Sequence, residues 1–506
     1  MTASRQKFLA AVVVLLFFGT LLWHGVEKPA LPMDEGFLLV YPELILKGQT
    51  PYRDFESFYG PANPYFLSGA YMLLGPSVPV ERTVGLLYRL LILAAVFALA
   101  QRWGTIITVG CATITGFLLV PTGIVAYAWM GGVALGLWSL WLSAKIEVPW
   151  RCWMGGVCAG LALLYRLDLG PAILASALPL FLMMERRSKW KWLLGMVTGL
   201  LPLGGLLWVA GSKALLDNLF LFPVIYSGVG RRLPLLSAEP YVIYLFFAHV
   251  VASVVNVTAG AWAVRRSPRE LQARLLLGWA IFGVGLTHQA IQRIDDLHVL
   301  YAAFVSIGLL PLSIHLFTGA EARGVNRSKT SLASVAVFAA LAALVPELAG
   351  GFRGELVTLF AANSNEAFVL KHGDRSFRLS SIGPARAAAA LLRELETLSS
   401  AGQRLFIGPA DLRRTNYNDT YLYHMLPKLR PATYFLEMNP WSANRPGSRL
   451  ARDVGSADWL ILNRQWDGWN EPNRSREFGS DAPNVVVREQ FALQGEYGGF
   501  LLFRKK

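Results

Sequence analysis

The 506-residue sequence has few charged residues, 16% of the chain, whereas hydrophobic residues make up 54%. This balance is too apolar for a set of soluble domains. The three cysteines, Cys111, Cys152 and Cys158, all lie in apolar runs and indicate no disulfide framework. The sequence also lacks a metal-ligand spacing of His and Cys, a Walker-type phosphate loop and a dinucleotide-binding glycine motif. These absences argue against ATP-driven transport and nucleotide-dependent redox chemistry.

Apolar stretches near the length of a membrane span are abundant, and they predict a polytopic α-helical membrane protein of about eleven spans. The stretches are 8–24, 84–100, 104–121, 123–143, 152–165, 169–184, 192–210, 241–263, 275–291, 299–317 and 330–347. The short pair 152–165 and 169–184 can instead form one interrupted helix or a re-entrant hairpin. The first stretch is longer than the apolar core of a usual signal peptide and no small-x-small site follows, so an uncleaved span is favoured.

The excess of basic residues, a formal net charge of +14, is distributed in short clusters between the apolar stretches, such as 186–191 and 265–274. This pattern is typical of cytoplasmic membrane loops and not of a nucleic-acid-binding face. With a cytoplasmic N-terminus the inner segments are basic and the outer segments lean acidic. We therefore predict a multi-pass protein of the inner (plasma) membrane whose C-terminus, after an odd number of spans, is extracytoplasmic.

The composition becomes polar after Pro346, which divides the chain into a membrane domain, 1–348, and a small soluble domain, 349–506. In the soluble domain, Ser380 or Ser381 can cap a helix that has Pro384 in its first turn and continues over 385–398. Strand-like runs follow at 404–407, 459–462, 484–487 and 499–503. Together they predict an extracytoplasmic α/β or α+β domain.

The first outer loop, 25–83, contains adjacent Asp34 and Glu35 among many aromatic residues. A loop of this length usually has a function or its own structure, and its composition predicts interfacial helices along the membrane surface. Adjacent side chains on a helix diverge by about 100°. The two carboxylates are therefore expected to divide roles, one facing a reaction centre and the other a cation or a supporting Arg; a solvated acidic turn is the alternative.

Two more clusters of ionisable residues lie at predicted outer ends of spans: Arg166 with Asp168, and Arg293 with Asp295, Asp296 and His298. Ionisable groups at the point where the chain enters a membrane are costly unless they are paired or face water, so a functional role is the first hypothesis. The alternatives are an ion pair that closes a helical hairpin and a wet connecting loop. The charge pattern places all three clusters on the same face of the membrane.

Single residues carry weaker signals. Arg89 falls inside the second span, where it can snorkel to lipid headgroups or grip an anionic ligand. Arg231 and Arg232 are cations on the acidic side of the membrane and suit a phosphate-bearing ligand. His288 lies in an apolar run and is expected to be a packed or interfacial residue.

The first loop carries a resemblance to a family. Its segments 33–36, MDEG, and 46–55, LKGQTPYRDF, resemble the first outer loop of GT-C glycosyltransferases, polytopic enzymes that use polyprenyl-phosphate-linked sugars. Protein O-mannosyltransferases, the lipid A aminoarabinose transferase and mycobacterial arabinosyltransferases belong to that superfamily. Segments 166–170, 293–298, 423–427 and 471–473 are similar to bacterial GT-C-like membrane proteins whose substrates are mostly unassigned.

The resemblance implies an inverting glycosyltransferase that moves a sugar from a polyprenyl-phosphate carrier to a glycan, lipid or protein acceptor of the cell envelope, on the extracytoplasmic face. By motif position Asp34 would be the base for the acceptor hydroxyl, with Glu35 as second choice. The remaining ionisable residues would bind the lipid phosphate or the sugar: Arg166, Asp168, Arg293, Asp295, Asp296 and His298, with Arg89, Arg231 and Arg232 in reserve. Such a displacement needs a carboxylate to accept a proton and cations to stabilise the departing phosphate.

No cofactor is certain, but a divalent cation, Mg²⁺ or Mn²⁺, between Asp34 or Glu35 and the phosphate is an open alternative. Two other functions compete with the transferase. A secondary transporter or lipid flippase should have inverted repeats or charges at mid-bilayer, and the sequence has neither. A role in envelope assembly would account for the C-terminal soluble domain but not for the clusters of ionisable residues.

Overall fold

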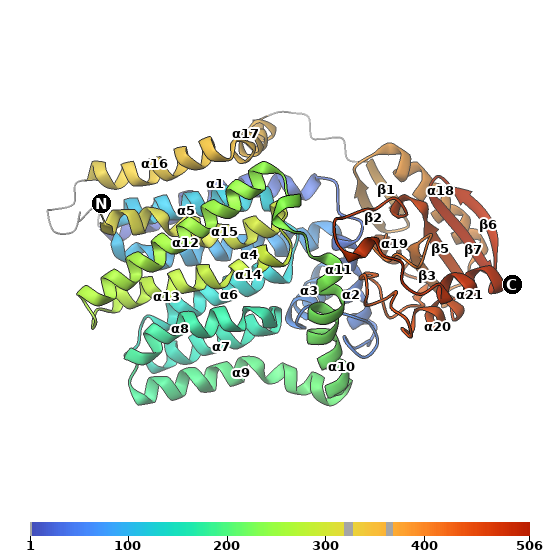
Figure 1. Ribbon diagram of the computed structural model, residues 1–506, viewed down its shortest axis with the longest axis horizontal. Coiled ribbons are helices and arrows are strands. Elements are labelled where there is room, and N and C mark those ends of the chain that lie inside the picture. The colour runs from blue at the N-terminus through green and yellow to red at the C-terminus, as the bar shows by residue number, and fades with distance from the viewer. Residues whose placement is uncertain (1–2, 318–326, 361–367) are drawn as a thin grey trace. The chain divides into compact units, whose positions relative to one another are not determined.

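The computed structural model describes residues 3–317, 327–360 and 368–506 (Figure 1). Internal contacts divide the chain into two compact units. The helical unit comprises Met1–Gly25, Gly85–Gly204 and Pro234–Ala362, and the mixed unit comprises Val26–Val84, Gly205–Leu233 and Asn363–Lys506. The first outer loop thus belongs to the same unit as the C-terminal residues, whereas the sequence suggested a boundary only near residue 348.

The long helices follow the apolar stretches, although the predicted stretches 275–291 and 330–347 each extend from one helix into the next. They are α1 Ala3–Trp23, α4 Val78–Ala100, α5 Thr105–Leu119, α6 Ala128–Ser143, α7 Pro149–Tyr165, α8 Gly170–Met183, α9 Arg186–Ala210, α12 Pro240–Arg266, α13 Leu271–Gly285, α15 Asp296–Phe317 and α16 Arg327–Leu344. The short α14, Thr287–Gln292, follows α13, and α17, Pro346–Phe360, follows α16.

Seven helices of the described residues are long and apolar enough to cross a membrane, or up to eight if the bent pair Leu332–Leu344 and Pro346–Phe360 is one span. The predicted number was eleven. The difference includes α6 and α8, which are apolar but have only 16 and 14 residues. The polytopic α-helical class is confirmed.

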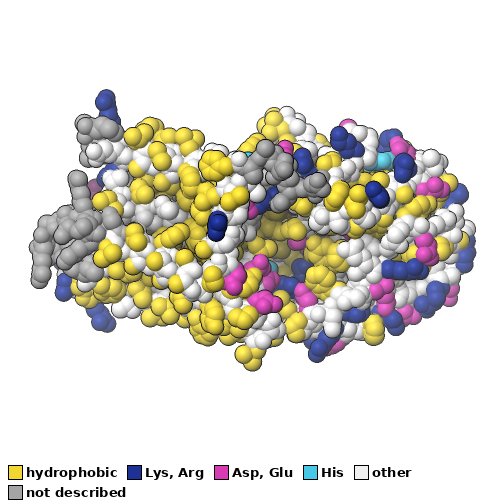
Figure 2. Space-filling model, turned by 90° about the horizontal axis from the view of Figure 1, so that it is seen from above, with side chains coloured by type: hydrophobic (Ala, Val, Ile, Leu, Met, Phe, Trp, Pro, Cys, Tyr) yellow, Lys and Arg dark blue, Asp and Glu magenta, His cyan; other side chains and the backbone are white. Residues whose placement is uncertain are grey.

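Close helix packing in this unit depends on small residues, as is common in membranes. A Cβ on Gly156 of α7 would lie 2.0 Å from the carbonyl oxygen of Trp192, and a Cβ on Gly195 of α9 would lie 2.0 Å from that of Trp153. The two backbones therefore touch without side chains between them. The outer surface of α9 exposes Trp190, Leu194 and Leu201, and Figure 2 shows hydrophobic side chains over much of the visible surface of the helices. Such a surface suits lipid and not water.

The mixed unit contains the first loop, the segment before α12 and the C-terminal residues. Its helices are α2 Asp34–Leu46, α3 Ala62–Leu74, α10 Ser212–Leu216, α11 Ser227–Arg231, α18 Ile382–Leu398, α19 Tyr421–Met425, α20 Leu450–Gly455 and α21 Ala482–Gln490. Its strands are β1 Phe368–His372, β2 Arg375–Leu379, β3 Arg404–Pro409, β4 Arg430–Pro431, β5 Trp459–Asn463, β6 Phe491–Tyr497 and β7 Phe500–Lys505. A five-stranded sheet has the order β4-β3-β5-β7-β6, and β1 and β2 form a separate hairpin.

Most predicted elements of the C-terminal region are present. Ser381 is the N-cap of α18, and β3, β5 and β7 match three predicted strands. The fourth prediction, a strand at 484–487, is wrong, because these residues lie in α21. Pro483 occupies the first turn of that helix and Val487 is buried by packing, so helix-start chemistry and burial outweigh the strand preference of the valines.

The first loop is helical, as predicted, but its two helices differ. In α2 the residues from Glu35 to Leu44 are all buried, so this helix is enclosed by protein within the mixed unit. Only α3 has the expected character of an interfacial helix, because it exposes Phe66, Met72 and Leu73. The buried α2 is the element that positions the acidic pair of the first loop.

Candidate active site

Asp34 and Glu35 are the first two residues of α2. Negative side chains are favoured in the first turn of a helix, where the helix dipole is positive. The two carboxylates have different surroundings: Glu35 is completely buried, whereas Asp34 is half-buried. Their divergence on the helix therefore separates a protein-facing acid from an accessible one.

Glu35 is held in a buried ion pair with Arg82, in the first turns of α4. Nε of Arg82 lies 2.6 Å from Oε1 and Nη2 lies 2.9 Å from Oε2 of Glu35. Arg82 also donates to the carbonyl oxygens of Val26, Lys28 and Pro29, and Oε2 of Glu35 accepts the backbone N–H of Leu31 at 2.7 Å. The pair thereby fixes the chain that leads into α2, and Glu35 has the supporting Arg that the sequence analysis considered for one of the two acids.

These bonds and the burial of Glu35 do not fit a metal ligand. Among the described residues, no group of three or more His, Cys, Asp or Glu side chains has the arrangement of a metal site. The divalent cation between Asp34 or Glu35 and a phosphate stays a prediction.

The charge of Asp34 acts on two residues of the C-terminal region, Tyr417 and Glu437. Burial raises the pKa of both groups, and the negative charge of Asp34 raises it further. Oε1 of Glu437 accepts a 2.7 Å hydrogen bond from the hydroxyl of Tyr41, which lies about two turns after Asp34 in α2. The start of α2 is thus surrounded by acidic and phenolic groups that come from distant parts of the sequence.

A second buried carboxylate, Glu56, extends this cluster. It accepts a short hydrogen bond from Ser442, and burial raises its pKa to about 8. Asn439 donates to Glu437 at 3.1 Å and to Glu56 at 3.5 Å. The positive charge of Arg231 acts on both carboxylates and opposes the effect of burial on their pKa. Of the adjacent arginines Arg231 and Arg232, the charge of Arg231 thus acts on the acidic cluster, whereas Arg232 is exposed.

In the helical unit, Arg166 lies between α7 and α8 and grips Asp168 with two hydrogen bonds, one of 2.9 Å from Nε to Oδ1. Its Nη2 also donates to Oε1 of Gln289 at 3.1 Å, and its guanidinium carbon lies 5.1 Å from the centre of the Trp129 ring. Nε2 of His288 lies 3.2 Å from Oδ2 of Asp168. His288, expected to be a packed or interfacial residue, is thus in contact with the carboxylate of Asp168.

The second cluster of this unit has the same construction. Nε of Arg293 donates to Oδ2 of Asp295 at 2.7 Å, while Oδ1 of Asp295 is 2.7 Å from Nδ1 of His298. Burial alone would raise the pKa of Asp295, but the hydrogen bonds of His298 and the charge of Arg293 lower it to about 2. Asp296 is exposed and its carboxylate accepts the backbone N–H of Leu297, which stabilises the start of α15.

Trp129 connects these two clusters at one end of the helical unit. Its indole N–H donates to the carbonyl oxygen of Tyr301 at 3.1 Å, its ring lies 5.5 Å from His288, and the Tyr301 ring lies 6.2 Å from His298. The structure therefore brings together two of the three clusters that are far apart in the sequence. Trp129 and His288 gave no sequence signal of their own, because both stand in apolar runs.

Arg89 has a different environment from the other candidates. It is completely buried in α4, and its guanidinium donates to the carbonyl oxygens of Gly85 and Val125 at 2.9 Å and of Thr122 at 3.2 Å. These bonds tie α4 to the turn before α6. The side chain does not snorkel to a surface.

No family model and no curated protein matches the chain. Among solved structures it is similar to ArnT from Cupriavidus metallidurans bound to undecaprenyl phosphate, with a TM-score of 0.55, 13% identity, and coverage of 98% of this chain and 97% of that chain. The apo state of ArnT gives a TM-score of 0.52 at 12% identity, with 97% of each chain covered. The likeness to ArnT shows the fold of this chain, and the long apolar helices of the described residues support an integral membrane protein.

Proposed function

We propose that the protein is a GT-C glycosyltransferase that moves a sugar from a polyprenyl-phosphate carrier to an acceptor hydroxyl on the extracytoplasmic face of the membrane. Three observations support this proposal: the GT-C fold over nearly the whole chain, undecaprenyl phosphate bound to a protein of similar fold, and the half-buried carboxylate of Asp34 at the start of α2. The Asp34 carboxylate is the observation on which the proposed reaction depends.

Asp34 serves as the general base. Its carboxylate takes the proton of the acceptor hydroxyl while the oxygen of that hydroxyl forms a bond to the anomeric carbon of the donor sugar. The bond between the anomeric carbon and the phosphate oxygen breaks, and its electron pair leaves with the polyprenyl phosphate. Because attack and departure occur on opposite sides of the carbon, the anomeric configuration inverts.

The arginines of the helical unit bind the departing phosphate. Arg166 and Arg293 are each oriented by a neighbouring carboxylate, Asp168 and Asp295, so that their planar guanidinium groups are fixed before the ligand arrives. A guanidinium of fixed orientation suits two-point binding of a phosphate better than an ammonium does. His298, held by Asp295, adds a hydrogen-bonding ring beside them.

The test compares the same isosteric change at two aspartates. Asp34→Asn keeps the volume but removes the basic oxygen, so sugar transfer should fall by about 10²- to 10⁴-fold while donor binding persists. Transfer is measured in membranes with a panel of labelled polyprenyl-phosphate sugars. Asp374→Asn is the matched control, because the Asp374 side chain is 87% exposed and lies in the turn between β1 and β2. Near-parental turnover of Asp34→Asn would contradict the assignment of Asp34 as the general base.

A further inference from the structure

Three aromatic side chains of the C-terminal region form a compact group, named here the aromatic cluster: Tyr417, Trp466 and Trp469. The ring centres of Tyr417 and Trp466 are 4.3 Å apart, and those of Tyr417 and Trp469 are 5.6 Å apart in a stacked arrangement. Trp466 is buried, whereas Tyr417 and Trp469 are only half-buried. Two large aromatic faces thus remain partly open to the surroundings, outside the core that Leu460, Leu462 and Leu501 form under the sheet.

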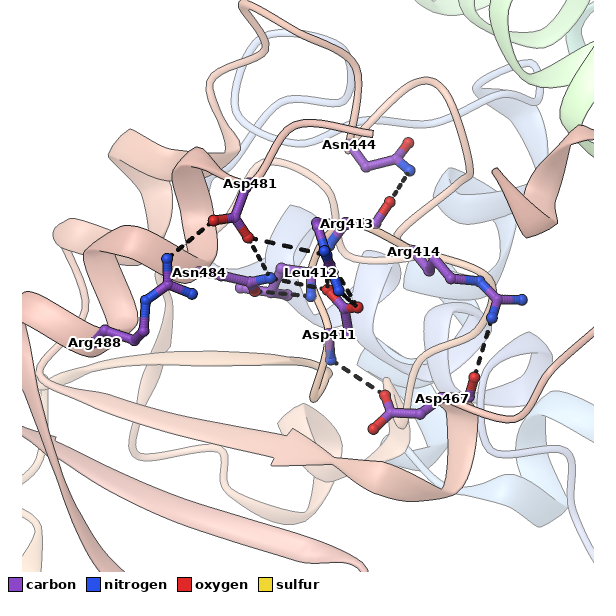
Figure 3. A network of polar contacts seen from close by, with 9 residues as sticks. All are labelled: Asp411, Leu412, Arg413, Arg414, Asn444, Asp467, Asp481, Asn484 and Arg488. Atoms are coloured by element: carbon purple, nitrogen blue, oxygen red, sulfur yellow. Dashed lines mark hydrogen bonds and ion pairs between the residues drawn. The ribbon is translucent and has the colours of Figure 1, made fainter. Parts of the chain in front are cut away.

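Polar groups hold these rings in place. Asp419 accepts a 2.8 Å hydrogen bond from the indole N–H of Trp466 and a 2.6 Å bond from Asn463. Arg414 donates to the carbonyl oxygens of Asp467 and Trp469, and Figure 3 shows that Arg414 and Asp411 both reach Asp467. The turn that carries Trp469 is therefore fixed from two sides, as a preformed binding surface requires.

The aromatic cluster borders the proposed base. The segment after Tyr417 packs against the start of α2: the backbone N–H of Tyr421 donates to the carbonyl oxygen of Pro32 at 3.0 Å, and a Cβ on Gly36 would lie 2.5 Å from that nitrogen. The charge of Asp34 accordingly acts on the phenol of Tyr417 and raises its pKa. A general base acts when its oxygen lies about 2.6–3.2 Å from the atom that carries the proton. The atoms next to the attacking hydroxyl must therefore lie against the neighbours of Asp34, among which Tyr417 presents an aromatic ring.

We propose that the aromatic cluster binds the sugar ring that carries the attacking hydroxyl, so that the acceptor of this enzyme is a glycan. This inference rests on the proposed transferase function and names the substrate class of the same site. The C–H groups on one face of a pyranose complement the negative face of an aromatic ring, while its hydroxyls require polar partners at the edge.

Such a polar partner stands next to the cluster. Asn416 is 6% exposed, and its Nδ2 donates to the carbonyl oxygen of Trp469 at 3.4 Å. Its Oδ1 is buried and has no hydrogen-bond partner in the described part of the chain. A buried acceptor without a donor is unfavourable, and a sugar hydroxyl supplies the missing donor. A phospholipid chain would leave it unsatisfied.

The test uses Trp469→Leu, which keeps an apolar side chain without a ring, and Trp469→Phe, which keeps a ring. The acceptor probe is a bacterial envelope polysaccharide fraction freed of protein and phospholipid, and the donors are labelled polyprenyl-phosphate sugars. Trp469→Leu should raise the KM for the polysaccharide at least about tenfold and leave the KM for the donor unchanged, and Trp469→Phe should restore most of the affinity. Trp190→Leu, in an exposed tryptophan of α9, is the control for loss of an indole.

The outcomes separate this inference from the proposed function. Labelled product on protein or on phospholipid only, with Asp34→Asn inactive, keeps the transferase but overturns the glycan acceptor. A rise in the KM for the donor in Trp469→Leu would mean that the cluster binds the donor sugar, which also overturns it. Failure of the parent protein to form labelled product from any donor in the panel removes the transferase function itself.

Discussion

The ion pair between Glu35 and Arg82 allows the roles of the two adjacent acids to be separated. Both side chains are 3% exposed or less, so Glu35→Gln removes the ion-pair partner of a buried guanidinium, on which the charge of Glu81 still acts. Breaking a buried pair on one side costs about 3–5 kcal/mol. Arg82 keeps its bonds to the carbonyl oxygens of Val26, Lys28 and Pro29, which places Glu35→Gln at the lower end of this range.

Arg82→Met should be the more destabilising change, because it strands the Glu35 carboxylate and removes the donor from those three carbonyl groups. The free energy of unfolding of the purified protein is measured by chemical denaturation, and sugar transfer is then scaled to the folded fraction. Glu35→Gln should lose stability while each folded molecule retains most of its turnover. If Glu35→Gln instead keeps parental stability and loses transfer about a hundredfold, Glu35 is the base and our reading of Asp34 fails.

Three more predictions follow from the same features. The first concerns topology and uses a background without native cysteines. Ser237→Cys and Ser480→Cys should react with an impermeant thiol reagent added outside, and Ser267→Cys should react only after the membrane is opened. Labelling of Ser267→Cys from outside would contradict the predicted topology. Arg293→Ala should weaken binding of polyprenyl phosphate and Arg293→Lys should restore it in part; parental binding in Arg293→Ala would make this arginine structural. Burial raises the pKa of Glu56 from 4.5 to about 8, so the folded state binds a proton more tightly than the unfolded state. The protein therefore loses up to about 4 kcal/mol of stability as the pH rises through this window. Glu56→Gln should remove this dependence of stability on pH in melting experiments from pH 5 to 9, and an unchanged dependence would contradict the prediction.

The sequence was most informative for elements that depend on residues close to one another in the chain. Apolar stretches specify helices directly, and the helix start at Ser381 and the strands β3, β5 and β7 follow from capping chemistry and from continuous apolar runs. The prediction for 484–487 failed because four residues with strand preference do not reveal the helix start at Pro483 that precedes them. The secondary structure of such a short segment depends on the residues around it.

The candidate site was predictable only in part, for a related reason. The accessible carboxylate of Asp34 was identified by its motif, but the partner of Glu35 lies 47 positions away at the start of a span. His288 was expected to be a packed or interfacial residue because its sequence neighbours are apolar, and only the fold places Asp168 against it. Composition and spacing reveal which residues are unusual, whereas their pairing depends on tertiary structure.

Hydrogen bonds to α2 give the C-terminal region a structural role in the candidate site. Glu43 of α2 is hydrogen-bonded to His424 at 2.5 Å and to Arg375 at 3.1 Å, and Tyr41 of the same helix is hydrogen-bonded to Glu437. A buried carboxylate without such partners is strongly unfavourable, and α2 is buried along most of its length. The first loop therefore cannot keep this conformation without residues more than 300 positions later. What the sequence presents as a separate external domain is thus part of the structure that holds Asp34 in position.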